Sequence, residues 1–566
     1  MDSSMSQPGD FIAASSAGSS TSSLPKTNDA SSSKKRYLEK VLSMIKSSLS
    51  MILILFSLVV ISAAIITKQT VATGENNVHP ILALCVFYFS LFWLAIMEGG
   101  LNCMVGLQPI SHELYKESHP KTYLCTRLSH KGQNIERFIV GRQYLDLMIV
   151  FITSFMVSSV DNASVLGLPK IVNDIFLGSD LAVILCTIVF GQLIAQINCA
   201  HNMLDFINNW VMVASTYAAL FVEASGILHA VYFVQIIFTK IVDNNNSEKE
   251  QGDIVKSSNS TINTSVGSGD SSSSSSDSGG DSDISVPMEF EVSSPEVTKK
   301  PLWQRIFFWV RVVFSLAISV FAIVVFSVAL VNGDTTIDEQ IPVPVSFLFL
   351  LILLVLGGFM EALQIALFAV KHLPEESIEE NPRAKRNCDY ILGKGDSKED
   401  NCRLQAFLVG RQIAQTIIMF MIARIITVEM KVEGETLFGV SQQIQAIFFD
   451  SGLLNALVST IFASLCWRVT ANFFPMLYLG SPFSIWIIRL CLIVEGTGIC
   501  DAAWTLAKIP AYIVGYKSDD EWISSATDAS SDIEEDLESA SKMDDRSNDR
   551  SIGCSARDEN QAIEER

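Results

Sequence analysis

The chain has 566 residues, of which 49% are hydrophobic, and its mean hydropathy is +0.35. Soluble proteins of this size rarely carry such a bias, so the composition excludes an ordinary soluble enzyme or binding domain. The net charge of −20 excludes little more, because much of the acidic charge lies in polar segments. No basic stripe with interleaved aromatic residues indicates a nucleic-acid partner.

The apolar residues form about ten blocks that are long enough for membrane helices. A hydrocarbon core of about 30 Å needs roughly 20 apolar residues in a helix. Continuous blocks of this length are typical of helices rather than of barrel strands. In chain order the blocks are 49–67, 80–106, 138–160, 180–200, 206–242, 307–331, 343–370, 407–428, 446–466 and 481–515. The sequence therefore predicts an all-α polytopic membrane protein with about ten transmembrane helices.

Three polar segments separate these blocks into two units. Residues 1–45, 243–300 and 517–566 are rich in Ser, Asp or Glu. They cannot bury enough apolar surface to offset the entropy of ordering, so we expect a disordered tail, linker and tail. The remaining residues, 46–242 and 301–516, form two units of five predicted helices each.

Basic residues orient the chain in the membrane. Lys and Arg residues crowd before the first block and in the loop 108–137, and short basic loops stay in the cytoplasm. This places the N-terminus in the cytoplasm, and ten crossings return the C-terminal tail to the same side. Five crossings place the 243–300 linker on the extracellular or lumenal side. The linker carries glycosylation sequons at Asn245, Asn259 and Asn263, which agrees with that side.

The two units repeat each other in sequence. Gly141-Arg142-Gln143 returns as Gly410-Arg411-Gln412, and Met97-Glu98 returns as Met360-Glu361. Further along, Glu223 and Gly226 return with the same spacing as Glu495 and Gly498. An odd number of helices in each unit would insert the second unit upside down relative to the first. We therefore predict two inverted five-helix repeats, an architecture typical of secondary transporters with a site near the mid-membrane.

Charged residues inside the blocks indicate where a polar site lies. An ionisable side chain costs roughly 2.5–3.5 kcal/mol at mid-bilayer on insertion scales, so it faces the protein interior and needs a partner. Glu98 with Arg142, and Glu361 with Arg411, are the natural pairs, each joining the second and third helices of its unit. One interpretation is a buried structural ion pair beside a packing glycine, Gly141 or Gly410. The duplicated placement favours a functional site.

The block 206–242 is too long for one crossing and has small residues in its middle. As a single helix its 37 residues would extend about 55 Å. The sequence Glu223-Ala-Ser-Gly226 could break the helix, and Glu495-Gly-Thr-Gly498 could do the same in the second unit. Broken helices expose carbonyls to ions, so Glu223 and Glu495 are candidate cation-coupling residues. The alternative is a face of small residues for close helix packing.

These motifs resemble the silicon transporters of diatoms and other silicifying algae. That family is similar in having ten spans in two halves, each with a Glu-Gly-x-Gln motif followed by Gly-Arg-Gln. Here the first motif reads Glu98-Gly-Gly-Leu101, without its Gln, and the second reads Glu361-Ala-Leu-Gln364, without its Gly.

The resemblance implies a sodium-coupled carrier for silicic acid. The residues that it implies for substrate binding are Glu98, Gln143, Glu361, Gln364 and Gln412. The altered motifs leave open a carrier for another small solute, such as boric acid or an anion. The long acidic tails leave open a membrane scaffold or sensor that transports nothing.

The sequence indicates neither an enzyme nor a cofactor or metal site. It lacks the nucleotide-binding signature, the nucleophile elbow and the zinc motifs that would indicate one. Expected partners are silicic acid, sodium and lipid, and both homo-oligomers and phosphorylation-dependent partners at the tails stay open. The expected location is the plasma membrane, with an intracellular vesicle membrane as the alternative.

Overall fold

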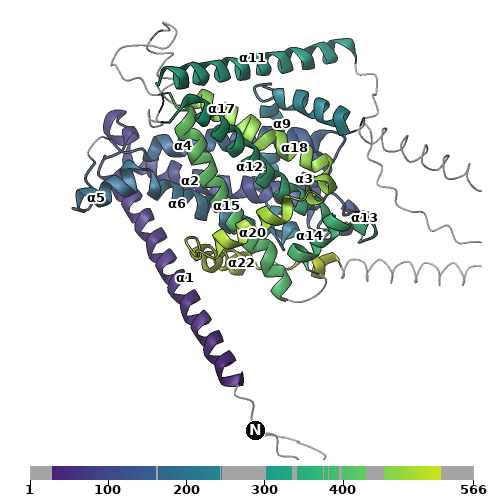
Figure 1. Cartoon of the computed structure of the whole chain (residues 1–566), viewed down its shortest axis with the longest axis horizontal. Coiled ribbons are helices and arrows are strands. Elements are labelled where there is room, and N and C mark those ends of the chain that lie inside the picture. Colours follow the sequence, from purple (N-terminus) through teal and green to yellow (C-terminus); the bar gives the residue numbers. More distant parts are fainter. Residues whose placement is uncertain are drawn as a thin grey trace, which may run out of the picture.

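The protein is an all-α membrane protein, as its computed structural model shows (Figure 1). The structure describes residues 28–160, 163–242, 244, 301–333, 335, 341–373, 375–379, 381–393, 398–428, 441 and 452–523. Within these residues eight helices are long and apolar enough to cross a bilayer. They span Val41–Ile66, Pro80–Gly106, Asn134–Val157, Leu181–Cys199, Leu302–Asn332, Val343–Val370, Arg403–Ile426 and Ala456–Phe473.

Each half arranges four long helices in the same order. In the first half these are α1 (Asn28–Ile66), α2 (Pro80–Gly106), α4 (Asn134–Val157) and the continuous run of α6 (Leu181–Ile188), η4 (Val189–Leu193) and α7 (Ile194–Cys199). In the second half they are α11 (Leu302–Asn332), α12 (Val343–Val370), α15 (Lys398–Ile426) and the run of α17 (Leu453–Thr460), η7 (Ile461–Leu465) and α18 (Cys466–Phe473).

Shorter helices fill corresponding positions in the two halves. A short helix precedes the third long helix of each half: α3 (Pro120–Ser129) and α14 (Pro382–Leu392). The π-turns η4 and η7 interrupt the fourth long helix at equivalent positions, separated by the same offset as Glu223 and Glu495. α8 (Met203–Ile207) and α19 (Pro475–Leu479) keep that offset too. The sequence repeat is therefore also a repeat of structural elements, down to the irregular turns.

The fifth predicted helix of each half does not form as one span. α9 (Trp210–Glu223) has 14 residues, and the chain then turns at Gly226, whose φ is +82°, before a second short helix, Ala230–Val242. At 1.5 Å per residue, α9 extends only about 21 Å. In the second half α20 (Ser484–Glu495) ends before Gly498, whose φ is +78°. The breaks predicted after Glu223 and Glu495 are present, and ten full-length spans are not found among the described residues.

The prediction of inverted repeats is wrong, because α2 and α12 lie side by side and run in the same direction. Gln364 donates to Asn102 at 2.7 Å. One turn further along both helices, a Cβ atom built on Gly106 would lie 3.6 Å from Phe368. From the first contact, Asn102 with Gln364, to the second, Gly106 with Phe368, the residue number increases by four on both helices. In antiparallel helices it would increase on one helix and decrease on the other. The two halves are therefore parallel repeats, related by an axis along the membrane normal.

The number of crossings explains this orientation. Four long helices bring the chain back to the end of the bundle where it started, so the second half begins as the first did. Consistently, Lys46 in α1 donates to the carbonyl of Gly496, and Arg311 in α11 donates to the carbonyl of Ala224 at 3.1 Å. Each half thus packs the first part of its first membrane span on the break in the other half. The linker and its sequons at Asn245, Asn259 and Asn263 lie outside the described residues.

The ordered chain extends into both predicted tails. α1 begins at Asn28, although we predicted disorder up to residue 45. Residues 517–523 pack on the end of the bundle, although the sequence placed the acidic tail from 517 onward. Asp519 is 1% exposed there and accepts from the Leu204 amide at 3.0 Å. Composition misses such a segment, because one buried carboxylate with a backbone partner orders residues that are otherwise polar.

One glycine in each half allows a close approach of two helix backbones. A Cβ atom on Gly141 in α4 would lie 1.8 Å from the Ala219 carbonyl oxygen in α9. A Cβ atom on Gly410 in α15 would lie 1.8 Å from the Cys491 carbonyl oxygen in α20. Neither backbone can give way without moving a whole helix, so both positions require glycine.

We expect Gly141→Ala and Gly410→Ala each to lower the free energy of unfolding by roughly 3 kcal/mol, because the added methyl overpacks a helix interface. Thermal unfolding of the detergent-solubilised protein measures the effect. The matched control is Gly178→Ala, since a Cβ atom there meets no atom within 4 Å. Equal melting temperatures for all three variants would contradict the packing argument.

Candidate functional site

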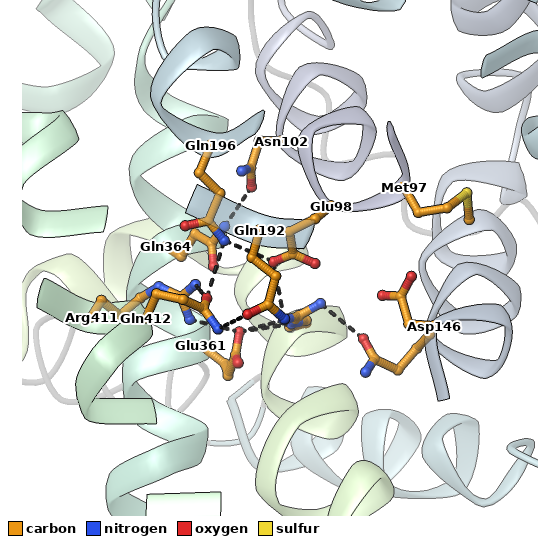
Figure 2. Close-up of polar contacts among 12 residues, drawn as sticks. Met97, Glu98, Asn102, Asp146, Gln192, Gln196, Glu361, Gln364, Arg411 and Gln412 are labelled. Atoms are coloured by element: carbon orange, nitrogen blue, oxygen red, sulfur yellow. Dashed lines mark hydrogen bonds and ion pairs between the residues drawn. The ribbon is translucent and has the colours of Figure 1, made fainter. Parts of the chain in front are cut away.

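A buried polar cluster lies where the two halves meet (Figure 2). It takes side chains from α2, α4 and the η4–α7 run of the first half, and from α12, α15 and α18 of the second. Three guanidinium groups and three carboxylates belong to it: Arg142, Arg411, Arg468, Glu98, Asp146 and Glu361. Arg142 and Arg411 are the two largest fully buried side chains among the described residues.

Arg142 neutralises carboxylates from two helices. Its Nη2 atom pairs with Glu98 in α2 and with Asp146 one turn along α4. Its Nε atom donates to the Met97 carbonyl at 3.1 Å, which fixes the guanidinium plane against α2. The predicted pair of Glu98 and Arg142 is confirmed. Asp146 is a second partner that the sequence-based pairing did not include.

The second half repeats this pair. Arg411 lies 3.2 Å from a Glu361 carboxylate oxygen, which confirms the predicted pairing. Its Nη2 atom also donates to Gln412 at 2.6 Å. In the first half Arg142 donates to Gln143 at 3.3 Å in the same way. In each Gly-Arg-Gln triplet the arginine therefore holds the amide oxygen of the next residue.

Arg468 on α18 joins the two halves. Its Nε atom donates to Glu361 at 2.9 Å, and its Nη1 atom donates to Gln143 of the first half at 2.9 Å. Its Nη2 atom also lies 4.0 Å from a Glu98 oxygen. The sequence analysis did not place Arg468 in the site, because the residue lies just after the predicted block 446–466.

Three glutamines that are linked by hydrogen bonds, Gln192, Gln196 and Gln412, also belong to the cluster. Gln196 donates to Glu98 at 3.0 Å and to Gln412 at 3.1 Å, so it also bridges the halves. Gln412 in turn donates to Gln192 at 2.7 Å. We did not predict Gln192 or Gln196. Their i, i+4 spacing in an apolar block puts both amides on one helix face, and this signal could have identified them.

Asn102 supplies an amide next to the position where the first Glu-Gly-x-Gln motif lacks one. The motif places Leu101 where a glutamine is expected, yet Asn102 accepts a hydrogen bond from Gln364 of the second half. Asn102 also donates to the Cys199 sulfur at 3.5 Å. The two corresponding helices α2 and α12 thus meet through an amide–amide contact that spans the halves.

Most of the predicted binding residues meet in this cluster, and the predicted cation residues do not. Glu98, Gln143, Glu361 and Gln412 share partners in it, and Gln364 reaches it through Asn102. Glu223 instead accepts from Arg137 at 2.9 Å and from Tyr232 at 3.3 Å, beside the break in the first half. Glu495 ends α20 at the corresponding break.

Several buried polar atoms of the cluster have no hydrogen-bond partner within the described protein. They include acceptors, namely the second oxygen of Asp146 and the amide oxygens of Gln196 and Gln364, and two donors of Arg411, Nε and Nη1, of which Nη1 forms only the ion pair with Glu361. Buried polar groups without partners cost free energy, so they are typical of a place where a ligand or water completes the hydrogen bonds. The cluster can therefore both donate to and accept from a small hydroxylated solute.

The chain is similar to a family of known transporters. A family model described as silicon transporter matches residues 39–256 and 291–564. These two regions include both halves and every residue of the polar cluster. No curated protein matches the chain, and no solved structure does.

The contact between Asn102 and Gln364 is expected to couple the halves. In a double-mutant cycle, Asn102→Ala and Gln364→Ala should show a coupling of about 1 kcal/mol, as for one buried neutral hydrogen bond. Thermal unfolding of the single and double variants measures it. Asn102→Ala combined with Asn76→Ala is the control and should be additive, because the Asn76 side chain bonds within its own π-turn. Additivity in both pairs would rule out the proposed contact.

Proposed function

The chain belongs to the silicon transporter family, which comprises membrane transporters and not enzymes, and on that premise we propose that it carries silicic acid across the membrane in symport with sodium. The polar cluster between the halves is the proposed solute site. Glu98, Gln143, Glu361, Gln364 and Gln412 are its proposed binding residues. The proposed location is the plasma membrane.

The observation that supports this most strongly is the charge balance of the cluster. Three guanidinium groups face three carboxylates, so the site as a whole has no net charge for an ionic solute to neutralise. Silicic acid is uncharged near neutral pH, and each of its hydroxyls both donates and accepts. Amide and carboxylate groups can satisfy such a solute by hydrogen bonding alone.

The same balance weighs against an anion as the solute. Each arginine of the cluster already contacts a carboxylate, and an anion would have to displace one of them at a large desolvation cost. Boric acid remains the alternative solute, because it is also an uncharged hydroxylated acid. Competition between silicate and borate in uptake assays separates the two.

Parallel halves suit alternating access as well as inverted ones do. Rocking of the halves about the cluster would open it first to one side and then to the other. At the end of the bundle near Asn102, several contacts join the halves in this state. Lys371 donates to the Ala200 carbonyl at 2.7 Å, and Asp519 accepts from the Leu204 amide at 3.0 Å. We propose that these contacts close the cytoplasmic side and must separate during each cycle.

We expect Gln143→Ala and Gln412→Ala each to reduce silicate uptake about tenfold, the effect of losing roughly 1.4 kcal/mol of binding. Radiotracer uptake into proteoliposomes, with sodium inside or outside, measures both the solute and the coupling. The control is Gln405→Ala, whose amide donates to the Ile197 carbonyl at 2.9 Å, away from the proposed binding residues. Full uptake by the Gln143 and Gln412 variants would refute the site, and uptake unaffected by sodium would refute the symport.

We also propose that the 243–300 linker lies on the cytoplasmic side, because α1 and α11 begin at the same end of the bundle. In a background with Cys85, Cys402 and Cys554 replaced by Ala, Ser271→Cys should then react with an impermeant thiol reagent only from the side on which a cysteine introduced at Ser3 reacts. In the same background, Asn77→Cys should react from the opposite side, since the loop between α1 and α2 lies at the other end. Labelling of both positions from one side would contradict the parallel arrangement.

A further inference from the structure

The two halves of the polar cluster differ in charge at two equivalent positions. Arg468 corresponds to Gln196, because it occupies the same place in the fourth long helix, just after the π-turn, in its half. Gln415 corresponds to Asp146, since each lies one helical turn after the arginine of its Gly-Arg-Gln triplet. The contacts are equivalent too: Gln196 bonds Glu98 and Gln412, and Arg468 bonds Glu361 and Gln143.

These two differences give the halves opposite charges. In the first half one cation, Arg142, faces two carboxylates, Glu98 and Asp146. In the second half two cations, Arg411 and Arg468, face one carboxylate, Glu361. With all groups ionised, the first half carries one net negative charge and the second half one net positive charge. The cluster is neutral only while the two halves are in contact.

The first half holds its excess charge among oxygen atoms that lack partners. Asp146 is 6% exposed and Gln196 is fully buried, and one side-chain oxygen of each has no hydrogen-bond partner among the described residues. The nearest balancing charge is the Arg468 guanidinium, 4.0 Å from Glu98. That distance is long for an ion pair, and Arg468 belongs to the other half. Separation of the halves would withdraw this charge and leave a buried carboxylate uncompensated, which is strongly unfavourable.

We propose that Glu98 and Asp146, whose second oxygen is buried without a partner among the described residues, form a binding site for a monovalent cation, and that Arg468 is the tethered cation that competes for it. The other charged groups facing the site are Arg142, Arg411 and Glu361. When the halves are in contact, Arg468 supplies the balancing charge. When they separate, a mobile cation takes its place. Hard cations such as sodium prefer oxygen ligands, which the two carboxylates supply.

The inference deepens the proposed cation coupling and is independent of which solute is carried. It places the cation at the cluster rather than at Glu223 or Glu495. It also explains why the duplicated site is unequal. With Gln in place of Arg468, the second half would keep only the neutral pair of Arg411 and Glu361, and no tethered cation would balance the excess negative charge of the first half.

Cation binding can be tested without any solute by thermal unfolding of the purified full-length protein. Sodium chloride is titrated against choline chloride at constant ionic strength and fixed pH. Wild-type protein should be stabilised by sodium, and Asp146→Asn should lose the response. Arg468→Gln should lower the sodium midpoint at least about fivefold, because the competitor is removed. Arg468→Lys, which keeps a tethered cation, should stay close to the wild-type midpoint.

Three controls make the outcome decisive. Gln415→Asn changes the equivalent position of the second half and should leave the sodium midpoint unchanged. Loss of the response in Glu223→Gln, with Asp146→Asn unaffected, would overturn the assignment. An Arg468→Gln midpoint equal to that of wild type would overturn the competition. Should that variant fail to fold, Asp146→Asn decides alone, since it leaves the pair of Arg142 and Glu98 intact.

A pH titration at a fixed sodium concentration shows whether the cation that binds at the site is sodium or a proton. Stabilisation by acid that Asp146→Asn abolishes would assign a proton to the site in place of sodium, which overturns the sodium assignment. If neither sodium nor protons raise the melting temperature of the protein, the proposal is overturned. Silicate uptake by the same protein tests the solute assignment separately, so either idea can fail without the other.

Discussion

The neutralisation of charge inside the membrane is the constraint on which the rest of this structure depends. Three arginines and three carboxylates lie deep among apolar helices, where an isolated charge is expensive. Each therefore needs an opposite charge within reach. Arg142 and Arg411 lie on the third long helix of their half, and Glu98 and Glu361 lie on the second. This requirement turns one face of each of these helices inward and brings the two halves together around a shared polar core.

Close helix packing makes this pairing geometrically possible. Gly141 and Gly410, directly before the two arginines, let α4 and α15 approach the carbonyls of α9 and α20 with no room for a methyl group. The glycine and the arginine of each triplet thus serve different faces of one helix. One face packs backbone against backbone, while the other presents a cation to the centre of the protein. The glutamine that follows contributes the amide to which the arginines donate.

The duplication is close in geometry but unequal in chemistry, and the inequality concerns transport. A strictly symmetric cluster would offer two identical sites to the same ligands. With Arg468 in place of Gln196, and Gln415 in place of Asp146, one half has a surplus guanidinium and the other a surplus carboxylate. In the mechanism that we propose, a neutral solute lies between the halves while one cation neutralises the first half. The proposed exchange of Arg468 for a mobile cation would link cation binding to the separation of the halves, which is what coupled transport requires.

Block length and composition determined from the sequence alone that this is a polytopic helical membrane protein, and the duplicated motifs identified the buried pair of Glu and Arg in each half. These features can be read along the chain, because they are local or recur in order. Only the tertiary structure decided the direction of the second half. From its hydrophobicity, the segment 206–242 was predicted to be one crossing. A turn at Gly226 instead leaves α9 too short to cross, so each half has four long helices rather than five crossings. Arg468, Gln196 and Asn102 find partners in the other half, far away in the chain. Such contacts depend on which helix faces meet, and no local pattern of residues specifies that.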